Sequence, residues 1–340
     1  MRIIFFGTPD IAVPTLERLI AGPHDVVGVV SQPDRARGRG RKTSPSPVAA
    51  VALREEIPLL RPEKVGEAET VAELARWNAD LGVVVAFGQF LPKKVRELPS
   101  KGYLINAHAS LLPKYRGAAP IARVIMDSEA ETGISVMRIE REMDAGPVAA
   151  VVRTPIAPQE NTAELSARLS KLAADAIADA VDVIARDEVL WTEQDPDAVT
   201  YAEKVEKADA ILDLREPARA LAGRIHALSP KPGGTITLAD GTALKISRAD
   251  VAAFKPSASA PPGTIERDAE DGTPLRIATG DGWLLPLVVQ KPGGKALPVE
   301  DFLRGFALSA ESGPCKIVPR ENAADERKTK GDDAAASVKS

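Results

Sequence analysis

Asn106 and His108 stand two residues apart in the segment 105–120, which reads INAHASLLPKYRGAAP and holds one of only three histidines in 340 residues. In an extended strand, side chains two residues apart point to the same face. An amide can donate hydrogen bonds to an oxyanion, and an imidazole can act as a general acid or base. The spacing therefore favours carbonyl chemistry, although a histidine at a strand end can also be an ordinary structural residue.

A carboxylate could orient the imidazole or hold its charge. The segment 138–147, RIEREMDAGP, offers Glu140, Glu142 and Asp144. Asp144 is the best candidate because the Ala-Gly-Pro sequence that follows it turns the backbone tightly and would fix its side chain. Without further information, Asp144 can equally be read as a simple turn residue.

The other two histidines offer a contrast. His24 lies in a GPHD turn and His226 lies in an amphipathic helical pattern. The sequence places no polar constellation around either of them. We therefore expect both to be structural.

The elements that must position these residues alternate between strand and helix in the first half of the chain. Helical patterns cover residues 10–20, 67–77 and 118–127, and a long one with a single apolar face covers 161–187. This alternation predicts a doubly wound, mostly parallel α/β sheet, in which ligands bind at the carboxyl ends of the strands. Short apolar runs typical of its strands occupy residues 2–6, 25–30, 81–87, 102–106 and 147–156.

The second half of the chain has a different pattern. A helix is predicted at 216–228, strand and turn signals follow with a turn at Asp240-Gly241, and a last helix is predicted at 298–306. This order favours a small antiparallel β-barrel. We predict a first domain at 1–187, a linker at 188–206, a barrel domain of the OB type at 207–318 and a disordered tail at 319–340.

Composition excludes several classes of protein. No apolar run approaches the ~20 residues of a membrane span, and the start of the sequence lacks the pattern of an export signal. Cys315 is the only cysteine, so neither an internal disulfide nor a multi-cysteine metal site is possible. We expect a cytoplasmic protein without a metal. No strong apolar surface stripe is visible, which favours a monomer.

The segment 35–42, RARGRGRK, is strongly basic in a chain whose net charge is −4. Such a run is often no more than a solvated surface loop. It follows the second predicted strand, however, and so emerges at the same edge as the expected site. Its basic residues are Arg35, Arg37, Arg39, Arg41 and Lys42.

The combination of NAHASLLPKYRGAAP with MDAG about thirty residues later resembles the signature of the folate-dependent formyltransferases. FFGTPDIAVPTL, SQPDRARGRGRK, SPSPV, VAFGQFLP and TYAEKV also resemble the methionyl-tRNA formyltransferases of that family, in order and spacing. The resemblance covers most of residues 1–206. The second half matches in architecture and in pieces such as PPGTI, but has Lys231 and Gly233 where the family usually has a tryptophan-rich stretch.

The resemblance implies a formyl transfer from 10-formyltetrahydrofolate to the amine of methionine on initiator tRNA. It implies that Asn106 and His108 polarise the formyl carbonyl and that Asp144 supports His108. It also implies that the basic segment contacts the tRNA, with no metal in the reaction. The folate-binding turn would comprise Ser110, Leu111, Leu112 and Pro113, and the pterin pocket would be lined by Phe87, Gly88 and Leu91.

Three other functions compete with this one. A formyltransferase acting on a small amine, such as an amino sugar nucleotide or a purine precursor, would share the Asn, His, SLLP and Asp residues but lack the basic insertion. A non-catalytic RNA-binding protein would not need those residues. A dinucleotide dehydrogenase is disfavoured because the first turn reads GTPDIA rather than GxGxxG.

Overall fold

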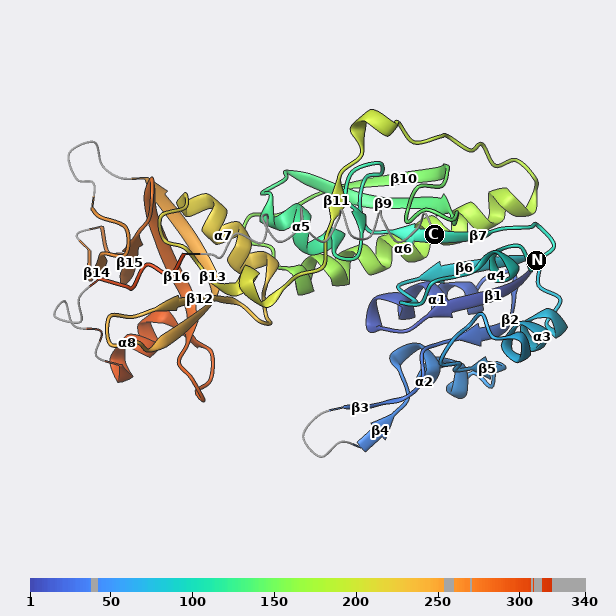
Figure 1. Ribbon diagram of the computed structural model, residues 1–340, viewed down its shortest axis with the longest axis horizontal. Coiled ribbons are helices and arrows are strands. Elements are labelled where there is room, and N and C mark those ends of the chain that lie inside the picture. Colours follow the sequence, from blue (N-terminus) through green and yellow to red (C-terminus); the bar gives the residue numbers. More distant parts are fainter. Residues whose placement is uncertain (38–41, 254–259, 270, 307, 309–313, 320–340) are drawn as a thin grey trace, which may run out of the picture. The chain divides into compact units, whose positions relative to one another are not determined.

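The computed structural model describes residues 1–37, 42–253, 260–269, 271–306, 308 and 314–319. The chain forms two compact units (Figure 1). The first comprises Met1–Ile121, Ala130–Ile156 and Glu164–Glu203; the second comprises Ala122–Glu129, Ala157–Ala163 and the residues from Lys204 onward. The expected tail lies, from residue 320 on, outside the described residues. None of the described helices is both long and apolar enough to cross a lipid bilayer.

The first unit is built on a mixed seven-stranded sheet, in which the five strands from β7 to β5 are parallel and the two at the other edge are antiparallel. The predicted α/β fold is therefore confirmed, with an antiparallel edge. In spatial order the strands are β10 (Val148–Pro155), β9 (Glu131–Arg138), β7 (Leu104–His108), β6 (Leu81–Val85), β1 (Arg2–Gly7), β2 (Asp25–Val30) and β5 (Leu59–Leu60).

Four consecutive residues of β1, from Ile3 to Phe6, are at most 1% exposed. Successive side chains of a strand point to opposite faces, so both faces of the sheet must be covered. Ile4 and Phe6 pack in one cluster with Val30, Leu74 and Leu104. The continuous apolar runs of the sequence are thus explained by a sheet with helices on its faces.

Six α-helices accompany this sheet along the chain. They are α1 (Val13–Ile20), preceded by a 3-10 turn at Asp10–Ala12, α2 (Pro47–Arg54), α3 (Ala68–Arg76), α4 (Lys93–Arg96), α5 (Pro120–Met126) and α6 (Thr162–Ala185). The four predicted helical patterns correspond to α1, α3, α5 and α6. Sequence patterns missed α2, whose N-cap is the Ser46 hydroxyl accepting from the Ala49 N–H at 3.0 Å, and the strand β9.

The segment predicted as an irregular linker pairs with the first unit at two places. Thr192 exchanges two backbone hydrogen bonds with Val148, and β11 (Tyr201–Ala202) runs parallel to β8 (Arg116–Gly117). A short 3-10 turn, Pro196–Ala198, lies between them. Residues 192–202 are therefore held against the segment that follows His108.

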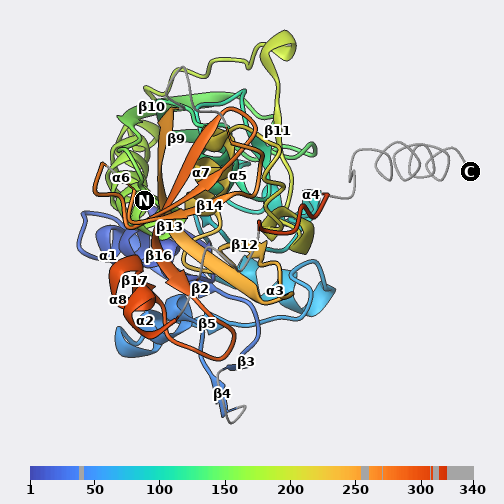
Figure 2. The same cartoon turned by 90° about the vertical axis from the view of Figure 1, so that its left-hand side faces the viewer.

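The second unit contains a six-stranded antiparallel sheet with α7 (Ala218–Ala227) and α8 (Val299–Gly305); α8 packs beside β16 and β17 (Figure 2). Cys315 donates its backbone N–H to Gly263, and Lys316 donates its own to Thr237, so one segment bridges both edges of the sheet. This closure agrees with the predicted barrel. The strands are β12 (Gly234–Thr237), β13 (Ala243–Ala253), β14 (Ile265–Arg267), β15 (Leu275–Ala278), β16 (Gly282–Gln290) and β17 (Leu297–Pro298). A 3-10 turn at Lys207–Ala210 precedes them.

Candidate active site

The carboxyl ends of β1, β2 and β6 meet at one edge of the sheet. The Thr8 hydroxyl and the Gln32 side-chain amide both donate to the backbone oxygen of Phe87, each at 3.0 Å. Gln32 also donates its backbone N–H to the Thr8 hydroxyl at 3.3 Å. The segments FGTPD and AFGQFLP therefore gather as the parallel sheet predicts, and β7 continues this edge beside β6.

Asn106 and His108 both lie on β7, where alternation places them on one face. Asn106 pairs with Val84 of β6 and Met137 of β9, and His108 pairs with Ser135. The Asn106 side chain is half-buried and, within the described residues, makes no hydrogen bond. Its amide can therefore donate to a ligand.

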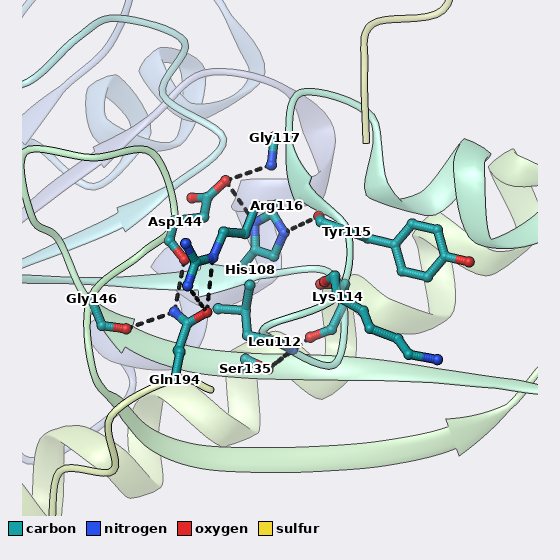
Figure 3. Close-up of polar contacts among 11 residues, drawn as sticks. His108, Leu112, Lys114, Tyr115, Arg116, Gly117, Ser135, Asp144, Gly146 and Gln194 are labelled. Atoms are coloured by element: carbon teal, nitrogen blue, oxygen red, sulfur yellow. Dashed lines mark hydrogen bonds and ion pairs between the residues drawn. The ribbon is translucent and has the colours of Figure 1, made fainter. Parts of the chain in front are cut away.

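His108 is 5% exposed and is held at both ring nitrogens (Figure 3). Its Nε2 lies 2.8 Å from the backbone oxygen of Tyr115, and its Nδ1 lies 3.5 Å from Oδ2 of Asp144. The structure thus brings together the imidazole and the carboxylate that are 36 residues apart in sequence.

These contacts determine where the imidazole carries its protons. A carbonyl oxygen only accepts hydrogen bonds, so Nε2 of His108 must be the protonated nitrogen toward Tyr115. Nδ1 then faces a carboxylate, an arrangement that is attractive when a proton lies between them and repulsive when both groups are unprotonated. The pair can therefore hold a transferable proton inside a site of low solvent access.

Asp144 is fixed by its backbone as well as by its carboxylate. Its φ is +52°, in the left-handed region that residues other than glycine rarely adopt. Oδ2 accepts a hydrogen bond from the backbone N–H of Gly117 at 2.8 Å. Gly146 is required two residues later, because a Cβ there would lie 1.9 Å from the backbone oxygen of Arg138. The tight turn inferred from Ala145-Gly146-Pro147 is therefore present.

The turn that follows His108 is closed by serine hydroxyls. Ser110 donates to the backbone oxygen of Lys114 at 2.6 Å. The Ser135 hydroxyl, on β9, donates to the Ser110 oxygen at 2.8 Å and accepts from the Leu112 N–H at 3.1 Å. Leu111, Leu112 and Pro113 are half-buried, and the Leu112–Pro113 peptide bond is cis. The predicted folate turn is thus an ordered surface beside β7.

Of the three residues expected to line a pterin pocket, two have buried side chains and the third is a glycine with a positive φ. Phe87 and Leu91 are 2% and 6% exposed and belong to the core cluster, where the Phe87 ring meets Phe6 edge-on at 5.5 Å. Gly88 has a φ of +81°, and a Cβ there would lie 2.5 Å from the Gln32 amide nitrogen. This segment can therefore offer a ligand backbone groups rather than the Phe87 or Leu91 side chains. Phe90 between them is 71% exposed.

Sequence reasoning missed four residues that support the site. Gln194 contacts the Asp144 turn, Arg116 contacts Gln194, and the Thr200 hydroxyl accepts the backbone N–H of Tyr115 at 2.9 Å. Ser135 is the fourth. Arg116 and Tyr115 belong to the quoted segment, yet their partners lie about 80 residues later in a stretch read as a linker. No local pattern marks these contacts.

The two described ends of the basic segment pair with one another as short antiparallel strands. Strands β3 (Arg35–Arg37) and β4 (Lys42–Ser44) pair in the register Arg35 with Ser44 and Arg37 with Lys42 (Figure 1). Arg39 and Arg41 lie outside the described residues. The base of the predicted loop is therefore a regular element that follows β2 at the carboxyl edge of the sheet.

The remaining histidines serve the fold, as expected. Nε2 of His226 lies 2.9 Å from the backbone oxygen of Ala249 in the second unit. His24 does have polar partners, contrary to the sequence interpretation: its two nitrogens contact the Met1 amine and the Asp182 carboxylate at 3.0 and 2.9 Å. Because His24 precedes β2, this cluster lies at the amino edge of the sheet, opposite the candidate site.

Comparison with known proteins matches this geometry to one family. Residues 1–181 match the family Formyl transferase, and residues 204–307 match the family Formyl transferase, C-terminal domain. The chain belongs to the formyl transferase family. The predicted resemblance is therefore confirmed, and the chain carries the two domains of a formyltransferase enzyme.

Relatives within this family cover nearly the whole chain. A methionyl-tRNA formyltransferase of Methylococcus capsulatus is 42% identical over 311 residues, which are 92% of this chain and 99% of the relative. One of Parvibaculum lavamentivorans is 43% identical over 310 residues, covering 91% and 98%. The N-formyltransferase of Helicobacter canadensis, solved with folinic acid and dTDP-3-aminofucose, has a similar fold, with a TM-score of 0.62 and 17% identity over 85% of this chain and 98% of that one.

Proposed function

We propose that this formyl transferase moves a formyl group from 10-formyltetrahydrofolate to the α-amine of methionine on initiator tRNA. One observation carries the proposal. His108, paired with Asp144, lies two residues from Asn106, whose amide makes no hydrogen bond to the described residues, in a chain that is 42% identical to a methionyl-tRNA formyltransferase over 92% of its length.

The side chains at the end of β7 can perform this transfer without a covalent enzyme intermediate. The amine attacks the formyl carbon, the carbonyl oxygen takes up negative charge, and the bond from carbon to the folate nitrogen then breaks. The Asn106 amide donates to that oxygen and stabilises the charge. The amine loses one proton and the folate nitrogen gains one, and we assign this proton transfer to the His108–Asp144 pair, whose Nδ1 and Oδ2 lie 3.5 Å apart.

Positioning supplies much of the remaining acceleration. A free α-amine has a pKa near ~8, so a useful fraction is nucleophilic at neutral pH. Holding this amine against a bound formyl group turns a bimolecular encounter into a local reaction. The enzyme's task is then to hold two substrates and to exclude water from the developing oxyanion.

The donor is assigned to the edge formed by β6 and β7. The turn from Ser110 to Pro113 and the backbone near Gly88 would hold the folate, and the Helicobacter canadensis structure of similar fold was solved with folinic acid. The unengaged donors of Asn106 fit a carbonyl oxygen presented by such a ligand. The 10-formyl isomer is the one that carries its formyl group on a nitrogen able to leave.

The acceptor tRNA is assigned to basic surfaces on each unit. The basic segment 35–42 has five basic residues, and its two ends form β3 and β4, which follow β2 at the carboxyl edge of the first sheet. In the second unit, the Lys245 ammonium donates to the backbone oxygen of Pro230 at 3.1 Å, next to Lys231 in the sequence. Burial lowers the pKa of Lys245, and the positive charge of Lys231 lowers it further. Closely spaced cations of this kind are typical of phosphate contacts. We assign residues 207–318 to tRNA binding on this basis.

We also expect a monomeric enzyme in the cytoplasm, where translation begins. Sedimentation equilibrium over a hundredfold range of concentration tests the first expectation, because a monomer keeps one mass throughout. Fractionation of the native host tests the second.

An acceptor comparison tests the function. Purified protein is given 10-formyltetrahydrofolate with methionylated initiator tRNA, methionylated elongator tRNA, free methionine or a dTDP-amino sugar, and a parallel set uses 5-formyltetrahydrofolate. We expect rapid formylation of the initiator tRNA from the 10-formyl donor only. Faster turnover of the amino sugar than of the initiator tRNA would instead favour the small-amine function.

A further inference from the structure

The side-chain amide of Gln194 joins two parts of the candidate active site (Figure 3). Its nitrogen donates to the backbone oxygens of Asp144 and Gly146, at 2.8 and 2.7 Å. Its oxygen accepts two N–H groups of Arg116, from Nε at 3.0 Å and from Nη2 at 2.8 Å. The amide thus makes four hydrogen bonds, which is all that its two donors and its carbonyl oxygen allow.

The turn that Gln194 bonds is the one that holds the Asp144 carboxylate. The φ of +52° at Asp144 is sparsely populated by residues other than glycine, so the surroundings must impose it. Gly117 bonds the carboxylate, and Gln194 bonds the main chain of the same residue. Arg116, next to Gly117 and only 9% exposed, fixes Gln194 in turn. Residues 116–117 and 194 therefore hold both the carboxylate and the main chain of Asp144.

The chain around Gln194 does not depend on this amide for its attachment. Thr192 exchanges two backbone hydrogen bonds with Val148, and Thr200 bonds the backbone of Arg116 and Pro113. Ala202 accepts a further bond from Ala119. These bonds remain when the Gln194 side chain is changed. Residues 192–202 are therefore attached to the first unit without the Gln194 amide, and the hydrogen bonds of this amide act specifically on the Asp144 turn.

We propose that Gln194 is a positioning residue for catalysis, which sets the Asp144 carboxylate against Nδ1 of His108 through its two donated hydrogen bonds. The inference rests on the proposed formyl transfer and adds to it a role for a residue outside the signature segments. A displacement of about 1 Å in a catalytic group can cost on the order of 100-fold in rate. Loss of the two donors should therefore lower kcat more than it lowers binding.

Gln194→Glu is the sharpest variant. It has nearly the same shape and keeps the oxygen that Arg116 contacts, but it turns a carboxylate oxygen toward the carbonyls of Asp144 and Gly146. We expect kcat to fall about 10- to 100-fold, with KM for donor and for tRNA within about threefold of wild type. Gln194→Ala should give a similar fall. Asn78→Gly, which removes a side-chain amide bond to the backbone oxygen of Arg76 at a residue whose φ of +43° glycine tolerates, is the matched control and should keep wild-type kcat.

A double-mutant cycle separates positioning from a general structural role. Rates are measured with enzyme in excess over tRNA, so that slow variants still give a signal, and with Gln194→Ala in both the wild-type and the Asp144→Ala backgrounds. If Gln194 acts through Asp144, its substitution should change the rate less than about twofold once that carboxylate is gone. Equal losses in both backgrounds, or full kcat in the Gln194→Glu variant, would overturn the inference.

The same measurements distinguish this inference from the function on which it rests. A wild-type enzyme that formylates no tRNA refutes the proposed function. A wild-type enzyme that formylates initiator tRNA, with Gln194 variants that match it, refutes only the role of Gln194.

Discussion

The backbone oxygen of Tyr115 lies 2.8 Å from Nε2 of His108, and this contact decides which nitrogen of the imidazole faces Asp144. Tyr115 itself has a φ of +60°, and its N–H is bonded to the Thr200 hydroxyl. This uncommon backbone conformation of Tyr115 directs its carbonyl oxygen toward His108. Such an arrangement is expected where the direction of a proton matters.

The first prediction follows from that orientation. His108→Ala removes the group that holds the transferable proton, and we expect kcat for tRNA formylation to fall by roughly 10² to 10⁴. The loss should appear in kcat rather than in tRNA binding, because His108 is 5% exposed and its ring nitrogens contact Tyr115 and Asp144. Steady-state kinetics and a filter-binding assay measure the two effects. His24→Gln, at the opposite edge of the sheet, should retain activity; equal losses in both variants would contradict the assignment.

A second prediction concerns the backbone of the Asp144 turn. Gly146→Ala places a methyl group 1.9 Å from the Arg138 oxygen, so the turn must move. We expect kcat to fall on the order of 100-fold, since the carboxylate moves with it. Gly22→Ala, in the turn after α1, is the control, because a Cβ there would lie no closer than 3.4 Å to its nearest neighbours, the backbone oxygens of Arg18 and Leu19, and activity should be unchanged. Wild-type kcat in the Gly146 variant would show that the carboxylate is not needed where the structure places it.

Strands and helices could be predicted where apolar residues are closely or regularly spaced in the sequence. Short apolar runs such as those within 2–6 and 81–87 are typical of strands buried on both faces, and α6 carries its apolar residues along one face. The strand β9 was missed because Gly133 and Ser135 interrupt its apolar run. Only the neighbouring strand β10 explains Gly133: a Cβ at this position would lie 2.1 Å from the Val152 backbone oxygen.

The site could be predicted as far as local spacing and family resemblance reach. Asn106 and His108 are two residues apart on one strand, so alternation alone joins them. Their carboxylate partner required the resemblance, and the supporting groups required the structure. The Gln194 amide reaches a residue fifty positions earlier, and His108 contacts a main-chain oxygen, whose position no side-chain pattern encodes.

A third prediction concerns the basic hairpin. Neutralising Arg39 and Arg41 to alanine removes two cations that we assign to tRNA phosphates. We expect the KM for tRNA to rise with little change in kcat, and the slope of log affinity against log salt to become shallower by roughly one per lost contact. Arg76→Ala, which removes an exposed arginine paired with Glu73 on α3, should leave the slope unchanged. An unaltered salt dependence in the double variant would remove the hairpin from the tRNA-binding surface.

A fourth prediction concerns Cys315, the only cysteine of the chain, which is 3% exposed in the core of the second unit. Burial raises the pKa of its thiol from 9.0 to about 12. At pH 8 the thiolate, which is the reactive form, should then be about a thousandfold scarcer than in the unfolded chain. We expect alkylation of the native protein by iodoacetamide to be correspondingly slow and to accelerate with denaturant as this unit unfolds.

The same pKa difference sets a pH dependence of stability. Well below pH 9 the thiol is neutral in both the folded and the unfolded state, and the burial of Cys315 contributes fully to the free energy of unfolding. As the pH rises toward 12, the unfolded thiol ionises while the buried thiol does not, so the unfolded state gains and stability falls. Denaturant titrations of wild type and Cys315→Ala should therefore differ most at pH 8 and progressively less at pH 10 and 11. A constant difference across this range, or rapid alkylation at pH 8 without denaturant, would mean that the thiol is open to water.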